Sequence, residues 1–130
     1  MRRMTGLTIA LAAVAAGVLT QAILAGGFLG GAGGARIGHA FVGFLLPCVA
    51  LVPAVLAFVE RGRRDVPGWA VIGAAALPVL LWIQNTLGHL PFAPATAIHV
   101  PLGVSLFGLS VALTIVSARA TERTGTDVGR

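Results

Sequence analysis

The sequence predicts an all-α integral membrane protein, a four-helix bundle built from two tandem helix pairs. Hydrophobic residues make up 57% of the 130 residues and charged residues only 10%, whereas a soluble domain carries about 25% charge. The apolar residues fall into four runs of roughly 20, which as helices match a hydrocarbon layer of ~30 Å. The runs lack strict polar–apolar alternation, which favours helices over the strands of a barrel.

The first apolar run covers residues 5–25 and follows Arg2 and Arg3. The alternative to a membrane span here is a cleaved signal peptide. The stretch Thr20-Gln21-Ala22 is a poor cleavage site, and the apolar run continues beyond it. We therefore expect the first span to be retained, and Gln21 with it.

The second span is predicted over residues 38–59. It follows a glycine-rich segment, residues 26–38, that lacks the Gly-Lys-Ser/Thr ending of a phosphate-binding loop and is predicted to be a flexible turn. Cys48 lies in the middle of this span and is the only cysteine of the chain. Disulfide chemistry between paired cysteines within the chain is therefore excluded.

The third and fourth spans are predicted over residues 68–88 and 95–118. A polar loop with three arginines, residues 60–67, precedes the third span, and Pro91 and Pro94 stiffen the link to the fourth. Residues 119–130 form a polar cytoplasmic tail, which we expect to be disordered from Thr121 onward. The whole chain is thus read as a single transmembrane domain.

Arginine sets the predicted orientation, because the chain has no lysine. Eight of the nine arginines fall on one side of the four spans: Arg2, Arg3, Arg61, Arg63, Arg64, Arg119, Arg123 and Arg130. Only Arg36 falls on the other side. The positive-inside rule then predicts that both termini lie on the cytoplasmic side of a bacterial plasma membrane. The lipid bilayer is the main partner. This asymmetry also explains the net charge of +5, so we do not predict nucleic-acid binding.

The acidic residues exclude several classes of function. All four lie outside the predicted spans: Glu60, Asp65, Glu122 and Asp127. Proton-coupled transporters generally carry the proton on a carboxylate inside the membrane. A zinc hydrolase needs a carboxylate or His-Glu-x-x-His cluster, and a Ser-His-Asp triad needs a buried acid. We find no catalytic constellation.

A repeated phrase marks the candidate site. Gln21 is followed by His39-x-x-x-Gly43, and Gln84 by His99-x-x-x-Gly103. Each of these two histidines is predicted about one turn inside the start of its span, on the side away from the termini. Because the two spans run in the same direction, the imidazoles are expected at the same depth. A histidine inside a membrane span is by default a candidate functional residue.

Both histidines are predicted to face the bundle interior, because helical spacing places each on a stripe of small and polar residues. The two stripes are Gly43, Leu46, Ala50, Ala54 and Ala57 after His39, and Gly103, Leu106, Ser110, Thr114 and Ser117 after His99. Two neutral imidazoles facing each other across an apolar bundle best suit the iron of a b-type haem. Copper or zinc is less favoured, because two histidines alone make an incomplete shell.

The remaining residues of the phrase are given supporting roles in this haem hypothesis. Gly43 and Gly103 would leave clearance for the flat macrocycle. Gln21 and Gln84 would orient a ligand ring or bind a propionate. Arg36, one turn before His39, would pair with a propionate.

On these residues the chain resembles a half-bundle of haem A synthase and the small bis-histidine b-type cytochromes of membranes. It is also similar to a family of small four-span bacterial membrane proteins with Gln and His at these places. The resemblance implies a haem-holding protein for electron transfer or sensing, possessing a membrane redox partner or partner subunit. The chain departs from haem A synthase in having Arg36 where that family has Glu, and in lacking its pair of outer-loop cysteines, so haem A synthesis is not implied.

Two other functions stay open at this point. The chain could be a cofactor-free structural or accessory subunit, with the Gln and His side chains bonding neighbouring helices. It could also be a small pore or transporter lined by Ser110, Thr114 and Ser117, although the missing carboxylates count against this reading.

Overall fold

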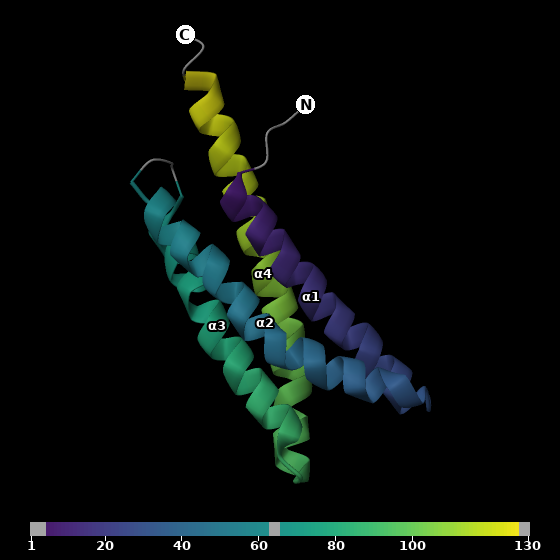
Figure 1. The fold of residues 1–130 in the computed structure, drawn as a ribbon. Helices are drawn as coiled ribbons and strands as arrows, with labels where there is room; N and C mark the ends of the chain where they lie inside the picture. Colours follow the sequence, from purple (N-terminus) through teal and green to yellow (C-terminus); the bar gives the residue numbers. More distant parts are fainter. Residues whose placement is uncertain (1–4, 63–65, 128–130) are drawn as a thin grey trace.

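A computed structural model describes residues 5–62 and 66–127 of the protein. These residues form four helices in an up-and-down bundle (Figure 1): α1 Gly6–Leu29, α2 Gly33–Glu60, α3 Gly68–His89 and α4 Ala93–Asp127. All four are long and apolar enough to cross a membrane. The predicted all-α, four-span architecture is therefore confirmed. The predicted orientation also depends on Arg2, Arg3, Arg63, Arg64 and Arg130, which lie outside the described residues.

The helices are longer than predicted where the glycine-rich segment was expected to be a flexible turn. Only residues 30–32 connect α1 to α2, and the glycines on either side are helical. The connection is a Schellman turn: Gly31 adopts φ +89°, its N–H donates to Phe28 O at 3.0 Å, and Ala32 N–H donates to Gly27 O at 3.0 Å. The prediction was wrong because helix hydrogen bonding in a bilayer outweighs the low helix propensity of glycine.

The fourth helix also continues beyond its predicted end. It runs to Asp127, so residues 121–127, which we expected to be disordered, are helical. Thr121 Oγ1 donates to the carbonyl of Ser117, one turn earlier, at 3.0 Å. A polar helix needs no apolar partner where it simply extends a helix that is already nucleated.

The four helices pack as a closed ring in which each contacts the next along the chain and α4 contacts α1. Figure 1 shows that the termini and the α2–α3 connection lie at one end, which we call the terminal end. The α1–α2 and α3–α4 connections lie at the other, which we call the hairpin end. There the α1–α2 hairpin and the α3–α4 hairpin point away from each other.

The residue pattern across the bundle is that of a protein in lipid. The fully buried residues are mainly leucine, valine and alanine, while large apolar side chains cover the outside, among them Ile72 at 71%, Val104 at 69% and Phe41 at 68% exposure. Both predicted stripes face inward as expected. Ala50 and Ser110 at their centres have no exposed surface.

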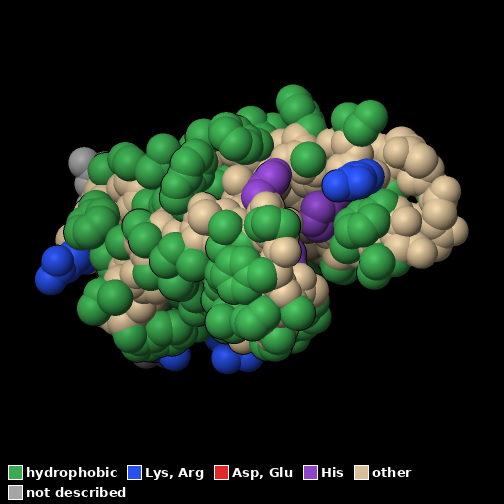
Figure 2. Space-filling view, turned by 90° about the horizontal axis from the view of Figure 1, so that it is seen from below, with side chains coloured by type: hydrophobic (Ala, Val, Ile, Leu, Met, Phe, Trp, Pro, Cys, Tyr) green, Lys and Arg blue, Asp and Glu red, His purple; other side chains and the backbone are tan. Residues whose placement is uncertain are grey.

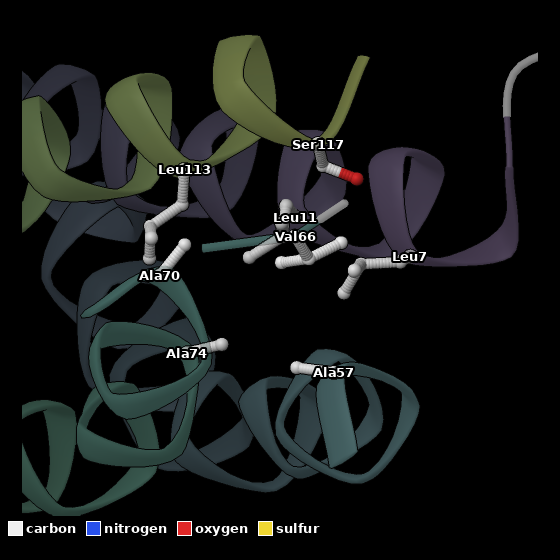
Figure 3. Close-up of a pocket in the computed structure, with 8 residues that line it drawn as sticks. All are labelled: Leu7, Leu11, Ala57, Val66, Ala70, Ala74, Leu113 and Ser117. Atoms are coloured by element: carbon white, nitrogen blue, oxygen red, sulfur yellow. The ribbon is translucent and has the colours of Figure 1, made fainter. Parts of the chain in front are cut away.

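Hydroxyl groups join the first and last helices at the terminal end, where Thr8 Oγ1 lies 2.9 Å from Ser117 Oγ. Thr5 caps α1, accepting a hydrogen bond from Thr8 N–H at 3.2 Å. A small apolar cavity adjoins this region (Figure 3), lined by Leu7, Leu11, Ala57, Val66, Ala70, Ala74, Leu113 and Ser117. Its volume of about 10 Å³ is room for one water molecule at most.

Candidate functional site

The two histidines of the repeated phrase meet at the hairpin end of the bundle. Each is the seventh residue of its helix, which places both about 9 Å from the helix start. Although α2 and α4 occupy opposite positions in the ring, the ring centroids of His39 and His99 lie 6.4 Å apart, with an interplanar angle of 66°. The two histidines thus have the equal depth and the inward direction that the sequence predicts.

In the first hairpin Gln21 and His39 are joined by two reciprocal hydrogen bonds between α1 and α2. The side-chain Nε2 of Gln21 donates to the backbone carbonyl of His39 at 2.9 Å. The ring Nδ1 of His39 lies 3.0 Å from the backbone carbonyl of Gln21. A carbonyl oxygen can only accept, so Nδ1 carries the proton.

The second hairpin repeats this arrangement between α3 and α4. Gln84 Nε2 donates to the carbonyl of His99 at 2.9 Å, and His99 Nδ1 donates to the carbonyl of Gln84 at 2.9 Å. We call each such pair a Gln–His bracket. The two brackets share residue types, atoms and distances, so the tandem repeat seen in the sequence is also a structural repeat.

The brackets fix the chemistry of both imidazoles. With Nδ1 donating to a backbone carbonyl, Nε2 is the ring nitrogen left to bind a metal. This is the arrangement in which proteins commonly prepare a histidine to bind a metal: the second nitrogen is tied to a carbonyl, which sets the tautomer and the ring orientation.

Gly43 and Gly103 explain the His-x-x-x-Gly spacing. A side chain four residues after the histidine would lie beside the histidine carbonyl. A Cβ added at Gly43 would lie 2.9 Å from Gln21 Nε2, and one at Gly103 would lie 2.9 Å from Gln84 Nε2. The glycines thus admit the Gln amides to carbonyls that already accept a helix bond. The flank in which we predicted clearance for a macrocycle is occupied by these amides.

The Gln side chains leave one polar atom each without a partner. Among the described residues, Gln21 Oε1 and Gln84 Oε1 are buried and accept no hydrogen bond. The amides cannot be turned around to correct this, because Nε2 must face the histidine carbonyl. Buried unsatisfied acceptors are uncommon in native proteins and often mark the place of a bound ligand, ion or water.

The other candidate residues lie at the edge of the site. Arg36 is exposed in the first turn of α2, one turn before His39. His89 is exposed at the end of α3, and its Nδ1 donates to Asn85 O of the same helix at 2.8 Å. Figure 2 looks onto the hairpin end and shows histidine side chains at the surface, with an arginine beside them.

Two residues near the site were given no role from the sequence. Asn85 reaches α2, where its Oδ1 would lie 2.9 Å from a Cβ at Gly43. Gly88 lies against the ring of His99, since a Cβ there would lie 2.9 Å from Cε1. Asn85 is recognisable in the sequence as a polar residue inside a span, whereas the contact of Gly88 depends on a side-chain orientation that no pattern gives.

The site is a two-histidine site. Among the described residues, no group of three or more His, Cys, Asp or Glu comes together to hold a metal ion. The chain matches no protein-family model, no curated protein and no solved structure. The resemblance to haem A synthase and to bis-histidine cytochromes therefore stays an expectation. Fold and site together define the class of protein: a multi-pass membrane protein with paired imidazoles at the hairpin end of its bundle.

Proposed function

We propose that the protein binds one b-type haem through His39 and His99 and uses it in electron transfer or sensing. The observation that carries the proposal is the juxtaposition of two imidazoles from opposite helices, each with Nδ1 donating to a backbone carbonyl. The hydrogen bonds do not require this juxtaposition of the two imidazoles, because each bracket makes its bonds within its own hairpin.

The donor atoms suit this group, but the glutamine amides beside Gly43 and Gly103 occupy the flanks where the macrocycle was expected, so these side chains must move for haem to bind. Metal–imidazole bonds measure about 2.0–2.1 Å, so one metal between two imidazole nitrogens holds the ring centroids roughly 6 Å apart. The observed centroid separation is 6.4 Å. Two neutral nitrogen ligands without Cys, Asp or Glu suit an iron whose remaining ligands come from a porphyrin.

A bound haem would supply a one-electron iron couple. The chain would supply the rest: His39 and His99 as axial ligands, the Gln21 and Gln84 carbonyls that hold their Nδ1 protons, and an apolar surround. Arg36 would pair with a propionate. We propose that both termini lie on the cytoplasmic side of a bacterial plasma membrane. In this orientation the site lies toward the outer face, within reach of a membrane redox partner.

An absorption spectrum of the protein purified in detergent tests the proposal. A b-type haem gives a strong Soret band, with sharpened visible bands on reduction. We expect these bands in the wild type and their loss in both His39→Ala and His99→Ala. His89→Ala is the matched control, because this exposed histidine lies outside the paired site, and it should keep the full spectrum.

The alternative is a cofactor-free accessory subunit, and the completeness of the brackets favours it. The Gln amides lie beside Gly43 and Gly103, and each bracket joins the two helices of its own hairpin without any ligand. This alternative requires a colourless wild-type protein after expression with haem supplied, together with His39→Ala and His99→Ala variants that still fold.

A pore lined by the α4 hydroxyls is not supported. Ser110 Oγ donates to Leu106 O at 2.7 Å and Thr114 Oγ1 to Ser110 O at 2.7 Å. Ser117 is 4% exposed and bonds the hydroxyl of Thr8 at 2.9 Å. The hydroxyls of this stripe are thus used in joining and satisfying helices inside the bundle.

A further inference from the structure

Two aromatic side chains meet on the lipid-facing side of the bundle, where α2 packs against α3. The rings of Phe44 and Trp82 contact each other edge-on, with centroids 5.6 Å apart and an interplanar angle of 70°. Phe44 is 60% and Trp82 49% exposed, so about half of each side chain faces the bilayer. The function proposed above uses neither residue. We call this pair the aromatic platform.

The indole N–H of Trp82 distinguishes the platform from the rest of the lipid-facing surface. The exposed hydroxyls of Thr20, Thr86 and Ser105 each donate to a carbonyl of their own helix, at 2.9, 3.0 and 2.9 Å. The indole of Trp82 makes no such bond within the described part of the chain. A donor without an acceptor is costly in hydrocarbon, so this N–H favours a partner that brings an acceptor of its own.

The depth of Trp82 places the lipid headgroups out of its reach. Trp82 precedes His89, the last residue of α3, by seven residues, which is about 10 Å along the helix axis. Side chains of an α-helix lean toward its N-terminus, and the N-terminus of α3 is at the terminal end. The indole is therefore directed away from the nearer membrane surface and toward the bilayer midplane. Trp69, the second residue of α3, lies instead where tryptophans usually anchor a helix at the headgroups.

A helix of another protein is also a poor source of the acceptor. Membrane helices approach each other closely where small residues line their surfaces. The exposed side chains beside the platform are large, among them Leu45, Val79 and Ile83. Most carbonyls of a partner helix would in addition already accept a bond from that helix. The acceptor that fits best belongs to a small molecule dissolved in the bilayer.

We propose that the aromatic platform binds the ring of a membrane quinone. A ring carbonyl of the quinone accepts the hydrogen bond of the Trp82 indole, and the planar ring packs against Phe44. A neutral ligand suits this surface, because α3 carries no Arg, Lys, Asp or Glu and α2 carries only Arg36 and Glu60, near its two ends. The isoprenoid tail stays among the acyl chains. The inference goes beyond the proposed haem function and does not depend on it.

The test is a titration of the full-length protein in lipid nanodiscs with decylubiquinone, a benzoquinone with an alkyl tail. The NMR signals of the two indole N–H groups are assigned with Trp69→Phe and Trp82→Phe. The signal of Trp82 should move downfield and saturate, because its N–H gains a carbonyl acceptor, while that of Trp69 should stay in place. Decylbenzene, which has a ring and the tail but no carbonyl, should not move the Trp82 signal downfield.

A pair of phenylalanine variants tests the platform itself. Phe44→Leu removes one ring and should weaken decylubiquinone binding by roughly twofold to tenfold. Phe41→Leu is the matched control, because Phe41 is also exposed on α2 but makes no ring contact within the described residues. It should bind as the wild type does. Both side chains face lipid, so neither change should disturb the core.

Two results would overturn the inference. One is an equal affinity of the wild type and Phe44→Leu for decylubiquinone. The other is a Trp82 signal that does not move, or that moves together with the Trp69 signal in proportion to the added quinone, since Trp82 would then only meet quinone as it meets any lipid. The absorption spectrum of the same preparation decides the haem proposal separately.

Discussion

Thr8 and Ser117 lie 109 positions apart in the sequence, and their hydroxyl oxygens are 2.9 Å apart inside the bundle. The contact joins the first helix to the last and closes the ring of helices at the terminal end. Thr5 Oγ1 extends it, 2.9 Å from Thr8 Oγ1. Because no water competes in a bilayer interior, these hydroxyls must find partners within the protein.

Replacing Thr8 with valine should weaken the closure of the bundle. The shape of the side chain is kept, but Ser117 loses its partner across the helix interface. Hydrogen bonds between membrane helices average about 0.6 kcal/mol and reach about 1.7 kcal/mol, so we expect a loss of unfolding free energy within this range. Denaturant titration in mixed detergent micelles measures it.

Thr20→Val is the control for this prediction. Thr20 is exposed on α1, and its hydroxyl donates to Ala16 O of the same helix at 2.9 Å. Its replacement should leave the unfolding free energy within error of the wild type. Equal losses in the two variants would contradict the assignment of a closing role to Thr8.

Leu77→Ala should be the more severe change, because Leu77 is completely buried in the core of the bundle. Truncating a buried leucine to alanine costs roughly 2–5 kcal/mol through lost packing and the cavity left behind. Val79→Ala, two residues further on at 62% exposure, faces the lipid and should cost far less. Unfolding curves of the two variants decide this, and similar midpoints would mean that α3 packs with another face inward.

The inward faces were predictable from sequence because they follow from helical spacing alone. Small and polar residues recur at steps of three and four after both histidines, and lipid accepts any large apolar side chain outside. The depth of His39 and His99 followed in the same way, from counting residues after the start of each span. These are properties of one helix at a time.

Features that depend on two helices at once were not predictable. The role of Gly43 was misjudged because the side chain that fills its flank, Gln21, comes from another helix and bonds a carbonyl rather than a ring. The contact between Gly88 and the ring of His99 depends on the rotamer of this histidine. Helix ends were misplaced for a different reason: glycine content signals flexibility in water, but in a bilayer it does not stop a helix.

Gly43→Ala and Gly103→Ala should disrupt the brackets. In each variant the new methyl group would lie 2.9 Å from a glutamine Nε2, so the amide must leave the histidine carbonyl. Overpacking of this kind typically costs about 1–3 kcal/mol. Gly108→Ala is the control, since a Cβ at that glycine of α4 meets nothing within 4 Å.

Two readouts check the glycine prediction. Unfolding free energy should fall in both bracket variants and stay at or slightly above the wild-type value in Gly108→Ala, where alanine improves helix propensity. If the wild type shows a Soret band, its absorbance should be lower in the two bracket variants, because the same contact positions the histidine carbonyl and ring. A tolerated alanine at Gly43 would show that the amide of Gln21 moves at no cost.

Gln21→Met should be nearly neutral in stability, against the usual expectation for a buried polar residue. The substitution removes the bond from Nε2 to the carbonyl of His39, but that carbonyl keeps its helix bond from Gly43. It also removes Oε1, a buried acceptor with no donor among the described residues, and an unsatisfied buried group costs about 1–3 kcal/mol. The bond from His39 Nδ1 survives, because its acceptor is the backbone of residue 21. We therefore expect a change within about 1 kcal/mol of zero in haem-free protein. A loss well beyond that would mean that Gln21 Oε1 is satisfied by an ordered water or ion even without haem, and the acceptor would then belong to a permanent polar network.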